Sequence, residues 1–235
     1  MKTLQLSVPF LFLVLFLVGC KQKEQVSNID TTTHCPNEVH LFSVADSLKK
    51  IKVDYQLETK SLLRSLEEKL STNVCGEFVV FGLTLTNGDM VKVKYNKMCN
   101  NAMIICFIRR HEARALLNKN GLLLMEHELI LIDSIKYWMR DNYIDGEVIY
   151  KNKTSICWYE NAPKDSIEKV FTNIKQGYNM IYKSYSQEIF SKKICDLNVK
   201  ELNFLKETFP LTIRLDLERT NLIPLPPPPI ETIEE

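Results

Sequence analysis

The spacing of apolar residues divides the first half of the chain into a helical and a strand-like part. Apolar residues recur every three or four positions between Leu41 and Leu70, with charged residues of both signs between them. This pattern predicts an amphipathic helix, or a helix pair, that covers a sheet. Its apolar stripe consists of Val44, Leu48, Ile51, Tyr55, Leu62, Leu66 and Leu70.

Beyond this stripe the pattern changes to alternation and to short solid apolar runs, which predict strands. Phe78–Leu85 and Met90–Tyr95 flank Asn87-Gly88. Asn-Gly between two such runs is a strong hairpin signal, because both central residues of the turn are expected to have positive φ. The run Ala102–Ile108 predicts a more central strand, and residues 113–118 predict another.

The second half of the chain alternates between helical and strand-like segments. Asn198, with Glu201 three positions later, predicts a capping box for a helix that ends before Pro210. The alternation over Leu211–Leu217 predicts a final strand, which we expect at a sheet edge. Other predicted helices are Glu128–Tyr143 and Lys164–Phe190, and other predicted strands are Leu122–Met125, Glu147–Tyr150 and Ser155–Tyr159.

These elements predict an α/β (α+β) fold, with two layers formed by a sheet and by helices packed on one of its faces. The expected regions are a signal at 1–19, a flexible tether at 20–40, a helix with antiparallel strands at 41–117 and an α/β domain at 118–217. A proline-rich acidic tail follows at 218–235.

The N-terminal residues have the parts of a secretory signal. Met1 and Lys2 precede an apolar run from Val8 to Val18, which is shorter than the roughly 18 to 20 residues that a membrane span needs. The ending Leu17-Val18-Gly19-Cys20 resembles the lipobox of bacterial lipoproteins. The resemblance implies cleavage before Cys20 and a lipid anchor of acyl chains on that residue, in the cell envelope. Lys21, in place of an aspartate, favours the outer membrane facing the periplasm over the inner membrane.

Charge and cysteine content narrow the function classes. The formal net charge of +1 falls to about zero without Lys2, whereas a nucleic-acid-binding protein needs a basic footprint. We therefore expect no nucleic acid partner. An oxidising compartment permits disulfides, but buried thiols are an equal alternative for each cysteine. The candidate disulfide cysteines are Cys35, Cys75, Cys99, Cys106, Cys157 and Cys195.

No motif predicts a catalytic, metal or cofactor-binding site, and we expect no cofactor. His111-Glu112 begins like the zinc-protease motif, but Ala115 occupies the position of the second histidine. His34 and His127 have no converging partners, so a structural or solvated role is favoured. The chain contains no Cys-x-x-Cys pair, no Gly-x-Ser-x-Gly elbow and no glycine-rich phosphate loop.

The region from about Asn118 to Leu217 resembles the periplasmic domain of ExbD/TolR-type biopolymer transporters, in the form common in Bacteroidetes. The resemblance rests on Asn120-Gly121 before a short strand and helix, on Ser155-Ile156, on Ile174-Lys175-Gln176-Gly177-Tyr178-Asn179, and on Phe190, Leu197 and Phe209-Pro210-Leu211-Thr212-Ile213. It implies a two-layer α/β domain, often a homodimer, that contacts motor complex components or peptidoglycan and performs no chemistry. Residues 3–19 contain no acidic residue, unlike the proton-coupling helix of the family.

The sequence therefore leads to three hypotheses of decreasing weight. The first is a non-catalytic envelope protein, held to membrane lipid through acylated Cys20, that binds envelope proteins or the cell wall. The alternative is an envelope lipoprotein that binds a small ligand or nutrient between its helical and strand-rich parts, in an apolar pocket with a few polar groups. The third is an enzyme that uses a cysteine near a histidine.

Overall fold

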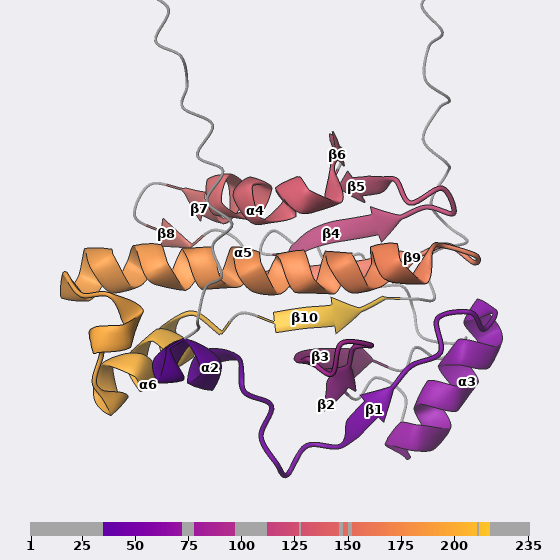
Figure 1. The fold of residues 1–235 in the computed structure, drawn as a ribbon, viewed down its shortest axis with the longest axis horizontal. Coiled ribbons are helices and arrows are strands. Elements are labelled where there is room, and N and C mark those ends of the chain that lie inside the picture. The colour runs from indigo at the N-terminus through magenta and orange to yellow at the C-terminus, as the bar shows by residue number, and fades with distance from the viewer. Residues whose placement is uncertain are drawn as a thin grey trace, which may run out of the picture. The chain divides into compact units, whose positions relative to one another are not determined.

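An eight-stranded mixed sheet with five helices packed against it forms the body of the protein (Figure 1), which confirms the predicted α/β fold. The computed structural model describes residues 35–71, 78–96, 112–126, 128–145, 148–149, 152–210 and 212–216. The strand order is β1-β2-β3-β10-β9-β4-β5-β6, and β7 and β8 pair separately.

The elements have the following bounds. The strands are β1 Lys50–Lys52, β2 Phe78–Thr84, β3 Met90–Asn96, β4 Glu112–Leu117, β5 Leu123–Met125, β6 Glu128–Ile130, β7 Ile144–Asp145, β8 Val148–Ile149, β9 Lys153–Trp158 and β10 Thr212–Leu215. The α-helices are α2 Pro36–Phe42, α3 Thr59–Leu70, α4 Ile135–Tyr143, α5 Lys164–Phe190 and α6 Val199–Thr208. Two 3₁₀ turns are η1 Ile132–Ser134 and η2 Ile194–Asp196.

The last strand, β10, lies in the middle of the sheet, so the prediction of an edge strand was wrong. It runs parallel to both neighbours, with Ile213 beside Val93 of β3 and Thr154 of β9. Alternation of apolar and polar residues suggested that one face of β10 is open to solvent. That second face does carry polar side chains, but they are largely shielded from solvent. On that face Arg214 lies 3.9 Å from a carboxylate oxygen of Glu112.

This central position of β10 joins the two regions that the sequence suggested, 41–117 and 118–217. The strand comes from the second region and pairs with β3 of the first, and β4 of the first region pairs with β9 of the second. The boundary expected after residue 117 therefore does not divide the fold, because one sheet and one apolar core contain residues from both sides of it.

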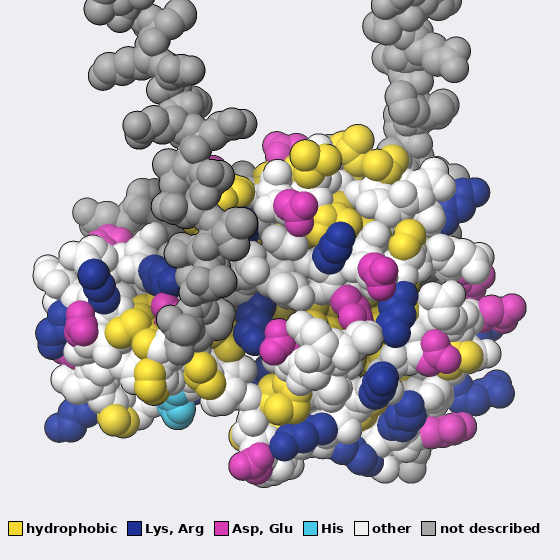
Figure 2. Space-filling view, viewed as in Figure 1, with side chains coloured by type: hydrophobic (Ala, Val, Ile, Leu, Met, Phe, Trp, Pro, Cys, Tyr) yellow, Lys and Arg dark blue, Asp and Glu magenta, His cyan; other side chains and the backbone are white. Residues whose placement is uncertain are grey.

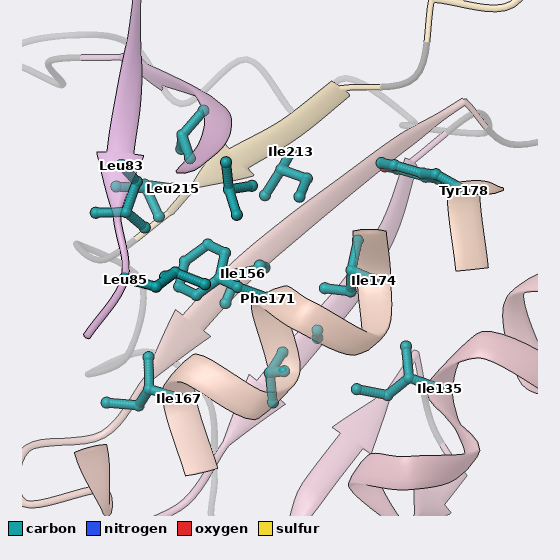
Figure 3. Close-up of a cluster of buried hydrophobic side chains, with 14 of the residues drawn as sticks. Leu83, Leu85, Ile135, Ile156, Ile167, Phe171, Ile174, Tyr178, Ile213 and Leu215 are labelled. Atoms are coloured by element: carbon teal, nitrogen blue, oxygen red, sulfur yellow. The ribbon is translucent and has the colours of Figure 1, made fainter. Parts of the chain in front are cut away.

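The helices α3, α4 and α5 cover the same face of the sheet, as predicted. Strand register places Tyr95 and Thr154 on this face, because Tyr95 lies beside Leu215, Thr154 lies beside Ile213, and residues two apart share a face. Tyr95 donates a hydrogen bond to Glu67 of α3, and Thr154 is hydrogen-bonded to Tyr143 of α4 and to Tyr178 of α5. Figure 3 shows the apolar contacts between α5 and the strands in this layer.

Helix prediction succeeded where the apolar stripe was long and the ends were marked. Helix α5 has the predicted bounds, and α6 has the predicted capping box, in which the Asn198 side chain accepts from the backbone N–H groups of Lys200 and Glu201. The Glu201 carboxylate accepts from the backbone N–H of Asn198 in return. These reciprocal bonds satisfy donors that a helix start otherwise leaves unpaired.

Two local predictions were wrong, and the predicted hairpin of β2 with β3 is confirmed but has a different turn. The stripe over residues 41–58 is not one helix, because Ile51, Val53 and Tyr55 alternate as buried positions and Lys50–Lys52 forms strand β1. Glu128–Tyr143 begins with β6 and η1 before α4. In the hairpin only Gly88 of the Asn-Gly pair has positive φ, +86°, so the turn is a longer loop closed by Leu85 and Asp89.

The described helices include none that is long and apolar enough to cross a membrane. The predicted strand Ala102–Ile108, the signal, the tether up to residue 34 and the tail lie outside the described residues, as does part of the strand predicted over Glu147–Tyr150. The flexible tether was expected to extend to residue 40, and this was wrong for residues 35–40, because Pro36–Phe42 forms helix α2 and Cys35 is bonded to Cys195.

Candidate binding pocket

A pocket with a cavity volume of about 260 Å³ opens where strands β3 and β10 begin. Helices α2, α5 and α6 supply its other walls. Figure 2 shows a hollow on this face between the part with α2 and α6 and the part with β2 and β3, with Lys and Arg side chains beside it. The lining residues are Leu41, Phe42, Ser43, Val80, Met90, Val91, Lys92, Val93, Lys94, Lys175, Tyr178, Tyr182, Lys206, Pro210, Thr212 and Ile213.

The apolar part of the lining comes mainly from α2 and the sheet. Leu41 is buried, and the ring of Phe42 packs against the ring of Tyr182 with centroids 5.9 Å apart. Val80 and Met90 are half-buried and line the same cavity from β2 and β3. These side chains form an apolar surface against which the carbon atoms of a ligand can be buried away from water.

All charged residues among the described lining are lysines. Lys92 and Lys94 come from β3, Lys175 from α5 and Lys206 from α6. The Lys94 ammonium lies 4.1 Å from the ring centroid of Phe78, so it already has a cation–π partner. Within the described residues, neither Lys92 nor Lys175 nor Lys206 forms an ion pair with a carboxylate.

Lys206 is the most constrained of these lysines. Its Nζ donates a hydrogen bond of 3.3 Å to the carbonyl oxygen of His40 in the last turn of α2. Burial lowers the pKa of Lys206, and the positive charge of Lys92 lowers it further. The two ammonium groups therefore repel each other in the pocket, and an anion between them would relieve this repulsion.

A chain of buried hydroxyl groups fixes the inner end of the pocket. Tyr178 donates to the backbone carbonyl of Thr212 at 3.0 Å, so its oxygen must accept from Thr154, whose Oγ1 lies 2.6 Å away. Thr154 must then accept from Tyr143, at 2.5 Å. Burial raises the pKa of both Tyr143 and Tyr178, so both phenols stay protonated at neutral pH. The chain orients the Tyr178 ring in the pocket wall.

Helix α2 reaches the pocket through links to residues far along the chain. Cys35, directly before α2, forms a disulfide with Cys195 in η2. The Asn37 side chain donates to the carbonyl oxygens of Ile194 and Leu197, at 2.9 and 2.8 Å. The buried carboxylate of Glu38 pairs with Lys183 of α5 at 2.9 Å. A seven-residue helix is too short to be stable alone, so these links hold the Leu41–Phe42 wall in place.

The structure places three of the seven cysteines that the sequence singled out. Cys35 and Cys195 form the disulfide, and Cys157 of β9 is a buried thiol whose Sγ lies 3.7 Å from the carbonyl oxygen of Ala115. The carboxylate of Glu38 lies within 4.8 Å of the two disulfide sulfurs, and these three residues could offer metal ligands only if the disulfide were reduced. Cys20, Cys75, Cys99 and Cys106 lie outside the described residues.

Sequence reasoning did not find the pocket. Its residues come from α2, β2, β3, α5, α6 and β10, and of these elements only β2 and β3 were predicted to be neighbours, as the two strands of a hairpin. The one available signal was Lys92 and Lys94 on the polar face of a strand, which is also the pattern of an ordinary solvated face.

Comparison of the chain with family models, with curated proteins and with solved structures gave no match. The resemblance to ExbD/TolR-type transporters therefore stays a prediction from the residues quoted above, and the pocket has to be interpreted from its own chemistry.

Proposed function

We propose that this chain is a non-catalytic cell-envelope lipoprotein, anchored through acylated Cys20, whose folded body binds a small molecule in the pocket. Of the two leading hypotheses from the sequence, the geometry favours the ligand-binding one. The observation that carries the proposal is a cavity of about 260 Å³ bounded by apolar side chains and a few polar groups. Pockets of this composition, and of several hundred Å³, commonly bind small molecules.

The composition of the lining supports binding over catalysis. The described residues that line the pocket include no histidine, cysteine or carboxylate that could activate a nucleophile. The hydroxyl of Ser43 donates to the carbonyl oxygen of His40 at 2.9 Å. The hydroxyl of Tyr178 is engaged in the buried chain, which orients it but leaves it a poor proton donor or acceptor for a substrate. These residues suit a site that binds a ligand and releases it without chemical change.

The test is a ligand-observed NMR screen of small molecules against the full chain in phosphatidylcholine nanodiscs. Val80→Trp should block the pocket, because Val80 lines it and is only half-buried. Val39→Trp is the matched control, since Val39 lies on α2, is exposed and does not line the pocket. We expect molecules that bind the wild type and the control but not Val80→Trp. Binding that survives Val80→Trp, or a screen without any binder, would reject the proposal.

A second candidate function, binding of an envelope protein, is favoured by a different surface, which we call the edge patch. It consists of Leu122, Leu129, Leu131 and Tyr137, around the edge strand β6 and the start of α4. Leu129 and Leu131 have exposed fractions of 61% and 77%. An edge strand with exposed apolar side chains can pair with a strand of a partner.

The edge patch is tested by crosslinking in intact cells, followed by mass spectrometry of the captured proteins. We expect motor complex components to be captured by the wild type and lost from Leu131→Lys. Capture that is the same for both proteins would reject the edge patch as the partner site.

A further inference from the structure

The lysines of the pocket suggest which ligands it selects. The chain as a whole is almost neutral, with a formal net charge of +1, whereas all four charged residues of the described lining are positive. Lys92, Lys175 and Lys206 come from three different elements and have no carboxylate partner among the described residues. By contrast, the exposed Lys50 elsewhere in this fold lies 3.1 Å from a carboxylate oxygen of Asp46. The pocket thus concentrates positive charge that nothing in the described lining neutralises.

The same lysines lie beside apolar side chains. Lys206 reaches the C-terminal end of α2 at His40, directly before the apolar pair Leu41 and Phe42. Among the described residues, the ammonium group of Lys206 donates one hydrogen bond, to His40, and an ammonium group has three donors, so two N–H groups remain for a ligand. A molecule that contacts both features must carry a negative group at one end and an apolar body at the other.

The volume limits the size of that molecule. If each non-hydrogen atom of a ligand takes up about as much space as a water molecule in the liquid, roughly 30 Å³, the cavity holds about nine such atoms. A medium-chain monocarboxylate has this size. Lysines suit such a head group, because they act as point charges, whereas arginine would bind a carboxylate or a phosphate through a planar bidentate fork. The described lining contains no arginine.

We propose that the pocket binds amphipathic monocarboxylates, with the carboxylate between Lys92, Lys175 and Lys206 and the apolar chain against Leu41, Phe42, Val80 and Met90. This inference deepens the proposed ligand-binding function and rests on it.

The experiment is equilibrium dialysis of radiolabelled octanoate against the full chain in phosphatidylcholine nanodiscs, with empty nanodiscs to subtract partition into lipid. 1-Octanol and octylamine have the same alkyl chain with a neutral and a positive head, and are measured in parallel. We expect octanoate to bind at least tenfold more tightly than 1-octanol, because only its charged carboxylate forms charge-assisted hydrogen bonds with the lysines. We expect octylamine not to bind, because its ammonium group is repelled by them.

The lysines are tested by single substitutions to methionine, which keep an unbranched side chain and remove the charge. Lys92→Met, Lys175→Met and Lys206→Met should each weaken octanoate binding several-fold, and leave 1-octanol binding unchanged. Lys60→Met is the charge-matched control, because Lys60 is exposed on α3 and does not line the pocket. Circular dichroism of each variant checks that it is folded.

The outcomes separate the two proposals. If octanoate and 1-octanol bind equally and Val80→Trp abolishes both, the pocket binds small molecules but the monocarboxylate inference is wrong. If octanoate binds but Lys60→Met weakens it as much as the three pocket variants do, nonspecific charge explains the binding and the inference is also wrong. If none of the three probes binds, the inference fails, and the NMR screen decides alone on the proposed function.

Discussion

The pocket and the edge patch are built in opposite ways. The edge patch comes from one stretch of the chain, residues 122–137, whose strands and helix follow each other directly. The pocket combines residues between 41 and 213 and depends on α2, which a disulfide attaches to a residue 160 positions later. A surface made from neighbouring residues can form with its own hairpin and helix, whereas the pocket exists only when distant segments are assembled.

This difference has a consequence for stability. Only a disulfide, a few hydrogen bonds and an ion pair hold α2 at the pocket. Substitution of a single one of these residues should therefore disturb the pocket strongly and leave the edge patch unchanged. The edge patch is exposed, so changes within it should alter partner binding without a cost in folding free energy.

Removal of the disulfide should have the largest effect. Cys35→Ser with Cys195→Ser should lower the free energy of unfolding by about 2 to 5 kcal/mol, because the bond closes a long loop in the unfolded chain. Urea denaturation of the full chain measures this. The loss should be accompanied by weaker ligand binding, since α2 carries Leu41 and Phe42. A variant with normal stability and normal ligand binding would show that the remaining contacts hold α2 in place without the disulfide.

The buried hydroxyl chain is the next test. Tyr178→Phe should cost about 1–3 kcal/mol, because Thr154 and the carbonyl of Thr212 lose a partner in a buried environment. Tyr137→Phe is the control on an exposed tyrosine and should cost almost nothing. Thermal denaturation compares the two. Equal stability of both variants would mean that the chain of hydroxyls does not stabilise the fold.

The same tyrosines predict alkaline instability. Burial raises the pKa of Tyr143 and Tyr178 in the folded state, so above pH 10 only the unfolded chain ionises them readily. Stability should be fully present below pH 10 and should fall by up to about 1.4 kcal/mol per pH unit for each tyrosine above it. Urea denaturation between pH 8 and 11 measures the slope, and Tyr178→Phe should reduce it. A slope that is the same in the wild type and the variant would contradict this explanation.

Packing of α4 on α5 supports the edge-patch side of the molecule. The Cβ atom introduced by Gly177→Ala would lie 2.7 Å from Met139 Sδ and 3.3 Å from the backbone Cα of Lys136. We expect a loss of about 1–2 kcal/mol, since overpacking outweighs the better helix propensity of alanine. Gln176→Ala, at the exposed neighbouring position, should be neutral or slightly stabilising. A stable Gly177→Ala variant would show that the Met139 side chain and α4 shift without cost.

The smallest effect on stability is expected at the edge patch. Leu131→Lys should change the free energy of unfolding by less than about 0.5 kcal/mol, because Leu131 is 77% exposed. Octanoate binding should also be unchanged. A large loss of stability would show that Leu131 contributes to the fold, and the edge patch would then lose its main argument.

The sequence predicted the elements with strong local signals and missed the assembly. Helix α5 was predicted correctly because its apolar stripe extends along most of its 27 residues, and α6 because Asn198 and Glu201 mark its start. Strand β10 was placed at the wrong position, because alternation reports one buried face and not the neighbours in the sheet. The helix predicted over Ile51 and Tyr55 failed because a spacing of four residues fits both a helix and a strand.

The pocket could not be predicted for a related reason. Lys92, Lys175 and Lys206 each look like solvent-exposed lysines in their own segments. Only the pairing of β3 with β10, and the attachment of α2, bring them to one cavity. The sequence predicted a ligand between helical and strand-rich parts as an alternative, but no residue of that site.

The most direct test of the central claim is residue-resolved acetylation of lysines in the full chain, with and without saturating octanoate, read by mass spectrometry. A carboxylate held in the pocket should slow acetylation of Lys92, Lys175 and Lys206 several-fold and leave exposed Lys60 unchanged. Equal acetylation rates of the three pocket lysines with and without octanoate would contradict the account.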